Sequence, residues 1–311
     1  MNIIKKTAVI LLLIITVISC GGKKNISTVT EENLVIEPPV PTRAERVTKA
    51  LAAAYPEQIK EVEFRNDDWA ILMWDTWYYF AGGRMLKEDQ LENRDNFTPF
   101  MFYGYPAELP PWREPTEEEV ERIQNRANVN RNVQRFYSSF LNDLWQAPNY
   151  NETERQMVRI SFLGKVAQVH KMIHPQTMLA EAQIRLAAQT DPEIQPWINS
   201  LNMVSSFGWR TIASSGARSY HSYGLALDFL PVNLRGQQTY WLWTVQGGRT
   251  DWYNVSYSER YHPPAAVIKI FEANGFIWGG KWQNFDTMHF EYRPEILYLN
   301  EILPMETTTI P

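Results

Sequence analysis

The chain has 311 residues, which is enough for two domains of about 150 residues each. Its 35 acidic and 30 basic residues give a formal net charge of −5, and this balance argues against a nucleic-acid-binding protein, which normally carries a basic patch. A hydrophobic fraction of 44% excludes a disordered chain, and the single cysteine excludes an intrachain disulfide and a cysteine-cluster metal site. A metal site would therefore need some of the five histidines together with carboxylates.

The first twenty residues have the pattern of a lipoprotein signal peptide. Lys5 and Lys6 precede an apolar run that is too short to span a bilayer, which takes about 20 apolar residues. A small residue, Ser19, then precedes Cys20, and this end resembles a bacterial lipobox. The resemblance implies cleavage after residue 19 and lipid attachment at Cys20, while an ordinary secretory signal is the alternative. We therefore expect a protein of the bacterial cell envelope that contacts a membrane, facing the periplasm or the surface, through a lipid anchor.

Residues 20–42 are polar and end in Pro-Pro-Val-Pro, which is typical of a flexible tether with a stiff end. Residues 43–150 form an aromatic-rich accessory region. Its rings either pack into a core or line a groove for a sugar polymer, and packing is favoured because aromatic side chains mostly serve cores. Thr116 and Glu119 have capping-box spacing, and apolar residues recur every three or four positions as far as Leu144. We expect one long helix to end this region.

The following segment, over residues 151–300, is predicted to be a second domain, with 301–311 as a polar tail. Apolar spacing predicts helices over about 152–173 and 177–189. After residue 200 the pattern changes to strands, with a short helix that opens at a Pro-Pro pair and closes at a glycine; the strands are expected at 225–230 and 288–292. This is an α+β pattern, in which N-terminal helices precede a small, mostly antiparallel sheet.

Two short motifs carry the candidate chemistry. In the first, His221 lies in a glycine-containing loop and Asp228 lies in an apolar strand, where an aspartate is costly unless it is paired or binds a metal. In the second, His289 starts a strand three residues after Asp286. Two histidines and a carboxylate are the protein ligands of an open catalytic zinc site, and its water needs a nearby carboxylate as base. Asp286 is available for that role, as is Glu291.

A histidine pair earlier in the chain is a weaker candidate. His170 and His174 are four residues apart, a spacing that can bind a metal on a helix. The pair lacks the glutamate of the His-Glu-x-x-His pattern, and Pro175 follows directly. A surface or helix-end pair is the favoured interpretation.

The two stronger motifs together resemble a known family. Residues 221–228 match His-x-x-Gly-x-Ala-x-Asp, and residues 286–291 match Asp-x-x-His-Phe-Glu. This order and a separation of about sixty residues resemble the VanY-like D-Ala-D-Ala carboxypeptidases and L-Ala-D-Glu endopeptidases. These are murein metallopeptidases that share a zinc fold with the hedgehog signalling domain. The resemblance covers about residues 155–298 and implies a Zn²⁺-dependent peptidase, with the zinc site in the small sheet, that cuts peptidoglycan stem peptides.

The resemblance also implies roles for single residues. Three of them match the zinc ligands: His221, Asp228 and His289. Asp286 matches the general base, a position where other members have glutamate. Arg210 looks like the family's arginine that holds a substrate carboxylate or the oxyanion, and Arg218 is a second candidate for the carboxylate. A surface ion pair is the alternative for each arginine. Trp282 belongs to a loop that could line the cleft.

A rival interpretation is a catalytically inactive cell-wall-binding lipoprotein that retains a structural zinc site. Asp286 favours the enzyme, because an inactive module need not keep a base three residues before a ligand. The motifs fit a carboxypeptidase and an endopeptidase equally well.

Overall fold

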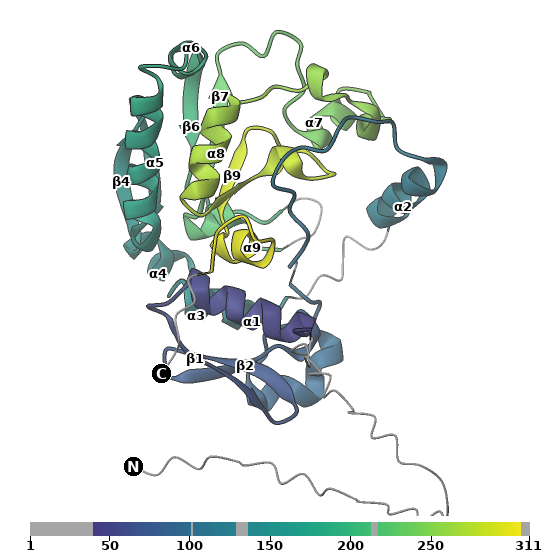
Figure 1. Ribbon diagram of the computed structural model, residues 1–311, viewed down its shortest axis with the longest axis vertical. Helices are drawn as coiled ribbons and strands as arrows, with labels where there is room; N and C mark the ends of the chain where they lie inside the picture. The colour runs from purple at the N-terminus through teal and green to yellow at the C-terminus, as the bar shows by residue number, and fades with distance from the viewer. Residues whose placement is uncertain (1–39, 101, 129–135, 213–216, 306–311) are drawn as a thin grey trace, which may run out of the picture. The chain divides into compact units, whose positions relative to one another are not determined.

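The structure is a computed structural model that describes residues 40–100, 102–128, 136–212 and 217–305 (Figure 1). The predicted signal peptide, the predicted lipidation site Cys20 and most of the predicted tether lie outside these residues. Among the described residues, no helix is both long and apolar enough to span a membrane.

The first part of the described chain is a helix packed against an antiparallel meander of three strands (Figure 1). Helix α1 covers Arg43–Ala54, and the strands β1, β2 and β3 cover Ile59–Arg65, Asp68–Met73 and Thr76–Tyr79. Asn66 and Asp67 join the first two strands with positive φ angles of 48° and 60°, which asparagine and aspartate tolerate in a tight hairpin turn. The aromatic-rich region therefore contains a small sheet that the sequence patterns did not predict.

The aromatic rings of this region pack mainly inward. Tyr78 and Tyr79 have no exposed surface, and Phe80 is buried as well. Trp77 is half-buried, with the Arg65 guanidinium 4.2 Å from its ring centroid. For these rings the structure confirms the interpretation as a packed core rather than as a sugar-binding groove.

The predicted single helix up to Leu144 is wrong. Helix α2 covers Glu117–Asn128, and its predicted capping box is confirmed, because the Thr116 and Glu119 backbone N–H groups each donate to the other residue's side chain. Helix α3 begins only at Ser138 and covers Ser138–Leu144. Tyr137 before it has a non-helical ψ of 89°, and its ring packs edge-on against Phe97 at 5.1 Å. Tertiary packing of these rings decides the backbone here, and residues 129–135 lie outside the described part.

The predicted helix over 152–173 is also wrong. This stretch forms a short helix and a β-hairpin: α4 at Tyr150–Arg155, β4 at Met157–Phe162 and β5 at Lys165–His170. Leu163 and Gly164, both with positive φ, make the two-residue turn between paired residues Phe162 and Lys165. The inward side chains Ile160 and Phe162 alternate as in a strand. The helical spacing predicted from the sequence arose because apolar residues of two strands were counted together as one helix face.

The predicted helix over 177–189 is confirmed as α5 (His174–Ala187), and α6 (Ile194–Ser200) follows it. The second main sheet has four antiparallel strands in the order β6-β7-β9-β8. Their bounds are Leu201–Ser205, Ala226–Pro231, His289–Tyr292 and Phe276–Trp278. The predicted strands are confirmed as β7 and β9, and the predicted short helix as α8 (Ala265–Ala273), closed by Gly275 at a φ of +87°. The α+β fold class is therefore confirmed.

The described residues from Pro41 onward form one compact unit, and within them one continuous hydrophobic core runs from α1 to helix α9 (Pro294–Leu299). Helix α9 lies between α1 and the four-stranded sheet (Figure 1), and it contacts both α1 and strand β8. The accessory region and the C-terminal region therefore share their core, and the boundary at residue 150 stays a prediction. A smaller cluster packs around helix α7 (Trp241–Gln246).

Candidate metal centre

The three candidate ligands meet at the middle of the four-stranded sheet. Asp228 on β7 and His289 on β9 are directly opposite each other in the antiparallel register. His221 lies in a single 3-10 turn, η4 (Tyr220–Tyr223), which ends shortly before strand β7 begins at Ala226. Gly224 closes that turn with a φ of +70°, and a Cβ there would meet the Met157 side chain and the His170 backbone nitrogen at under 3 Å. The glycine of the first motif is therefore required to deliver His221 to the sheet.

The ligand atoms of these side chains converge. His221 Nε2 lies 3.1 Å from Asp228 Oδ1 and 3.2 Å from His289 Nδ1. His289 Nδ1 lies 2.8 Å from the same Asp228 oxygen. All three residues are at least nine-tenths buried. Among the described residues, they form the one group of three or more histidine, cysteine or acidic side chains placed to share a metal ion.

Each histidine is oriented by a second hydrogen bond on its other nitrogen. His221 Nδ1 lies 2.7 Å from the Ser206 carbonyl oxygen, and His289 Nε2 lies 3.1 Å from Glu291 Oε2. Both partners are acceptors, so these two ring nitrogens carry the protons. The nitrogens that remain, His221 Nε2 and His289 Nδ1, then present lone pairs toward Asp228. Outer partners of this kind are what fix the tautomer of metal-binding histidines.

This donor set fits a divalent cation. When both histidines are neutral, His221 Nε2, His289 Nδ1 and Asp228 Oδ1 are all acceptors, and they lie within 3.2 Å of one another. No proton then lies between them to form a hydrogen bond. Ligands about 2.1 Å from one tetrahedral zinc ion lie roughly 3.4 Å apart, close to the spacing found here. Without a cation, protonation must supply the missing positive charge. Burial disfavours charge on His289, but the Asp228 and Glu291 carboxylates beside it hold its pKa well above the ordinary value.

Asp228 is held in its ionised form. Burial by itself would raise the pKa of this carboxyl group, but the adjacent His221 and His289 rings lower it below its ordinary value. A carboxylate that stays ionised inside the protein is the form that binds a metal.

Asp286 lies beside the three ligands and has a different environment. Its backbone carbonyl accepts from the His289 N–H at 3.2 Å, and its own N–H donates to Gly279. The side-chain oxygen Oδ1 is buried and has no hydrogen-bond partner among the described residues. Burial, aided by the Asp228 and Glu291 carboxylates and opposed by the charges on His289 and Arg210, raises the pKa of Asp286 to about 7. A buried carboxylate with a free oxygen and this pKa is suited to accept a proton near neutral pH.

Comparisons with known proteins agree with this geometry. Residues 213–292 match the family described as D-alanyl-D-alanine carboxypeptidase. The chain is 34% identical over 85 residues to the peptidoglycan L-alanyl-D-glutamate endopeptidase CwlK of Bacillus subtilis (strain 168). The C-terminal region is therefore similar to the VanY-like murein metallopeptidases over the matched residues. The match to the relative covers 25% of this chain and 42% of the relative's length.

Outside the C-terminal match, residues 47–102 match a domain of unknown function (DUF8518). No solved structure matches the chain.

Arg210 lies close to the candidate metal centre. Its guanidinium is half exposed, with one terminal nitrogen 3.7 Å from Asp228 Oδ2. Its backbone is fixed beside the metal-ligand turn, because the Arg210 N–H donates to Ser222 Oγ at 2.7 Å and the Ser219 N–H donates to its carbonyl. The arginine therefore reaches the edge of the metal centre with donors available to a ligand.

Arg218, the second candidate for binding a substrate carboxylate, has its terminal donors directed at the protein. Its two terminal nitrogens donate four hydrogen bonds to protein oxygens: Asn142 Oδ1, Ala147 O, Thr153 Oγ1 and Ser222 O. Its guanidinium also lies 4.1 Å from the ring centroid of Trp209 and 3.6 Å from that of Tyr223. These contacts leave its terminal donors occupied by the protein. Arg218 joins the metal-ligand turn to the segments before it, and its role in substrate binding stays a prediction.

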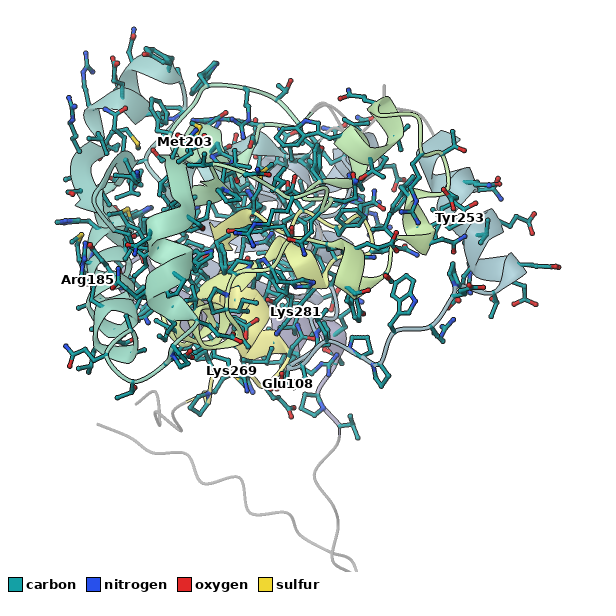
Figure 2. The ribbon with its side chains drawn as sticks, turned by 90° about the horizontal axis from the view of Figure 1, so that it is seen from above. Glu108, Arg185, Met203, Tyr253, Lys269 and Lys281 are labelled. Carbon is teal, nitrogen blue, oxygen red and sulfur yellow. The ribbon has the colours of Figure 1, made fainter. Side chains whose placement is uncertain are left out.

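The Trp282 ring lies against the His289 ring of the candidate metal centre. Its ring centroid is 5.5 Å from that of His289, and the ring is half-buried. The preceding residue, Lys281 (Figure 2), forms a buried ion pair with Glu272 at 2.5 Å and donates to the Ala107 carbonyl oxygen. The loop that carries Trp282 is therefore anchored to the N-terminal segment.

Two other predicted sites are resolved by their contacts. Glu291, the alternative base, accepts from His289 Nε2 on the side away from Asp228, so it orients a ligand. His170 accepts from the Met172 N–H through Nδ1 and therefore donates through Nε2 to the Trp145 carbonyl oxygen. Both of its nitrogens are occupied, and burial lowers its pKa to about 4, so it is a neutral core residue.

The sequence analysis did not find the Ser206 carbonyl oxygen, which orients the His221 ring. A backbone group leaves no signal in the sequence.

Proposed function

We propose that this protein is a zinc-dependent peptidase that hydrolyses peptidoglycan stem peptides while anchored to a membrane as a lipoprotein. One observation carries the catalytic part of the proposal. Three metal-binding lone pairs converge beside Asp286, whose buried side-chain oxygen has no partner among the described residues. A structural zinc site needs four protein ligands and no adjacent base, whereas a catalytic site keeps three ligands and one open position.

The residues that would hold zinc are His221 through Nε2, His289 through Nδ1 and Asp228 through its carboxylate. Bound there, zinc would act as a Lewis acid for a peptide carbonyl and would acidify an attacking water. Histidine and carboxylate ligands with no cysteine are compatible with this borderline cation.

Asp286 and Arg210 supply the remaining functions. Asp286 accepts a proton from the attacking water and passes it to the leaving amine, for which its raised pKa is well matched. Arg210 holds a carboxylate of the peptide with its exposed guanidinium, which offers paired N–H donors to a carboxylate. Trp282 shields the His289 side of the centre from water.

The bond that is cut is proposed to be either D-Ala-D-Ala or L-Ala-D-Glu. The matched family is described as a carboxypeptidase, and the relative in Bacillus subtilis is described as an endopeptidase. Digestion of purified muropeptides with the zinc-loaded protein, followed by mass spectrometry, distinguishes the two bonds. Loss of one D-Ala identifies a carboxypeptidase, and a cut after L-Ala identifies an endopeptidase. A zinc-loaded protein that gives neither product but binds peptidoglycan would contradict the proposal and support the rival, inactive module.

The lipid anchor is proposed from the sequence pattern around Cys20, which lies outside the described residues. Metabolic labelling with a radioactive fatty acid should mark the wild-type protein and should not mark the Cys20→Ala variant. Equal labelling of the two proteins, or no labelling of the wild type, would contradict the anchor without affecting the catalytic proposal.

A further inference from the structure

A chain of buried polar side chains leads away from the metal centre. It starts at His289 and continues through every second residue along β9 and into α9: Glu291, Arg293 and Glu295. Glu291 Oε2 accepts from His289 Nε2 at 3.1 Å, and its other oxygen lies 3.4 Å from an Arg293 terminal nitrogen. Arg293 Nε then donates to Glu295 Oε1. None of the four is more than 7% exposed.

The chain ends in the N-terminal region. The Tyr55 hydroxyl, directly after helix α1, donates to Glu295 Oε2 at 2.6 Å across a sequence separation of 240 residues. Tyr55 is 4% exposed, and its ring packs edge-on against Trp145 at a centroid distance of 5.5 Å. The packing of α1 on α9 brings the hydroxyl to Glu295 and fixes it there. A residue of the segment with unknown function thus ends a hydrogen-bonded path to a metal ligand.

The Tyr55 hydroxyl affects how the Arg293 guanidinium is shared between two carboxylates. Two carboxylates, Glu291 and Glu295, lie on either side of one guanidinium, and each buried oxygen needs a donor. Tyr55 satisfies the outer oxygen of Glu295 without adding a charge. If that donor were lost, Glu295 would compete for further N–H groups of Arg293 and draw the guanidinium from Glu291. The contact to Glu291 is the longer of the two, so it is the one that would break first.

We propose that Tyr55 is a positioning residue of the metal centre: through Glu295, Arg293 and Glu291 it holds the His289 ring in the orientation that binds the metal. The N-terminal region is then part of the metal site. This inference rests on the proposed zinc site. Outer partners of metal-binding histidines typically contribute about 10- to 100-fold in metal affinity, and a residue further out should contribute less.

The test compares two tyrosine-to-phenylalanine variants of the full chain. Tyr55→Phe removes the last donor of the path. Tyr78→Phe is the matched control, because the Tyr78 hydroxyl also donates to a carboxylate shared with a cation: Asp143 Oδ2 lies 2.5 Å from the hydroxyl and 2.8 Å from Lys87 Nζ. Among the described residues, no hydrogen bond or ion pair of these three side chains reaches a metal ligand. Zinc affinity is measured by competition with a chelating dye, and thermal unfolding is measured on the metal-free proteins.

The expected result is that both variants unfold at a lower temperature, whereas only Tyr55→Phe binds zinc more weakly, by roughly 3- to 10-fold. The absorption bands of the cobalt-loaded protein should also shift in Tyr55→Phe alone, because they report ligand geometry. Equal zinc affinity in Tyr55→Phe and the wild type would overturn the inference, as would an equal loss in Tyr78→Phe.

A second variant keeps the test decisive if Tyr55→Phe does not fold. Glu295→Gln retains the shape of the side chain but turns an N–H₂ group or a weaker acceptor toward Arg293, and it should weaken zinc binding at least as much as Tyr55→Phe. Unchanged affinity in this variant also overturns the inference. If the wild type itself bound no zinc, the proposed function would fail together with it; if the wild type binds zinc and the variants match it, only the role of Tyr55 fails.

Discussion

The N-terminal and C-terminal regions satisfy their hydrogen-bond acceptors in different ways. In the N-terminal region, the partly exposed Asp143 carboxylate accepts a hydrogen bond from the Tyr78 hydroxyl and faces the Lys87 ammonium, so its charge and lone pairs are matched locally. At the centre of the C-terminal sheet, His221 and His289, when both are neutral, direct two lone pairs at the buried Asp228 carboxylate. One region balances its acceptors with donors from the protein, and the other has an excess of acceptors.

This difference identifies the functional part of the molecule. A buried acceptor without a donor loses its hydration and gains nothing in return, which costs about 1–3 kcal/mol for each group. A fold tolerates several such acceptors at one place only when another interaction offsets the cost of burying them. Three converging lone pairs would bind a cation, which supplies that interaction. The predictions below test whether the excess of acceptors is the site of catalysis and whether the balanced groups are structural.

The largest expected effect is on turnover in the Asp286→Asn variant. An amide has no lone pair basic enough to accept the proton of water, so kcat should fall by about 10²- to 10⁴-fold while zinc remains bound. Assays of muropeptide cleavage and elemental analysis of the same preparation check both parts. Full activity in this variant would move the base to another residue.

The pH dependence of the wild type sharpens the same prediction. A base acts when it is ionised, so kcat/KM should fall as the pH drops below the pKa of Asp286. Burial raises that pKa to about 7 in the metal-free protein, and a bound cation would lower it. The acidic limb should therefore lie below pH 7 but above the ordinary value of 3.8. It should be absent from the residual activity of Asp286→Asn.

The next largest effect is on zinc binding. His221→Ala removes one of three ligands, and the affinity for zinc should fall by about 10²- to 10³-fold, more than for an outer partner. His262→Ala is the matched control, because His262 Nε2 lies 2.7 Å from the Tyr257 carbonyl oxygen and takes no part in the metal centre. Titration with a chelating dye measures both variants. Similar losses in the two would show that the three ligands do not form a common site.

The metal centre was more predictable than the fold around it. Each ligand lies in a short motif whose residue types are set by chemistry: two histidines, a carboxylate in an apolar strand and a glycine that only a positive φ explains. The grouping of His221, Asp228, His289 and Asp286 therefore followed from these two motifs together with the family resemblance that they carry, and the structure brings the four residues together.

The errors arose where tertiary contacts override local patterns. Met157, Ile160, Leu163 and Ala167 have helical spacing, but the turn at Leu163 and Gly164 folds them into a hairpin. Arg218 has the residue type of a carboxylate binder, yet its donors meet oxygens up to 76 positions away in the sequence. Such partners are set by packing, and one sequence does not display them. The path from His289 to Glu295 did leave a signal, because its residues stand at every second position of the sequence, from β9 into α9.

A smaller effect, on stability, is expected for Arg218→Lys. An ammonium group cannot reproduce four hydrogen bonds from two terminal nitrogens, so the free energy of unfolding should fall by about 2 kcal/mol, roughly 30-fold in the unfolding equilibrium constant. Urea denaturation of the metal-free protein measures this. At temperatures where the variant is folded, its KM should match that of the wild type. A raised KM with an unchanged free energy of unfolding in Arg218→Lys would support a role of Arg218 in substrate binding.

The smallest effect, and the opposite pattern, is expected for Arg210→Lys. The Arg210 guanidinium is half exposed and 3.7 Å from the nearest Asp228 oxygen, so the folded protein loses little when it is replaced. A peptide carboxylate that used two N–H donors would lose one of them, and kcat/KM should fall by roughly tenfold while the unfolding free energy stays unchanged. Steady-state kinetics on a muropeptide and urea denaturation separate the two quantities. Because both arginines flank the same turn, opposite outcomes for them would locate the substrate side of the metal centre, whereas unchanged kinetics in Arg210→Lys would exclude this arginine from the site.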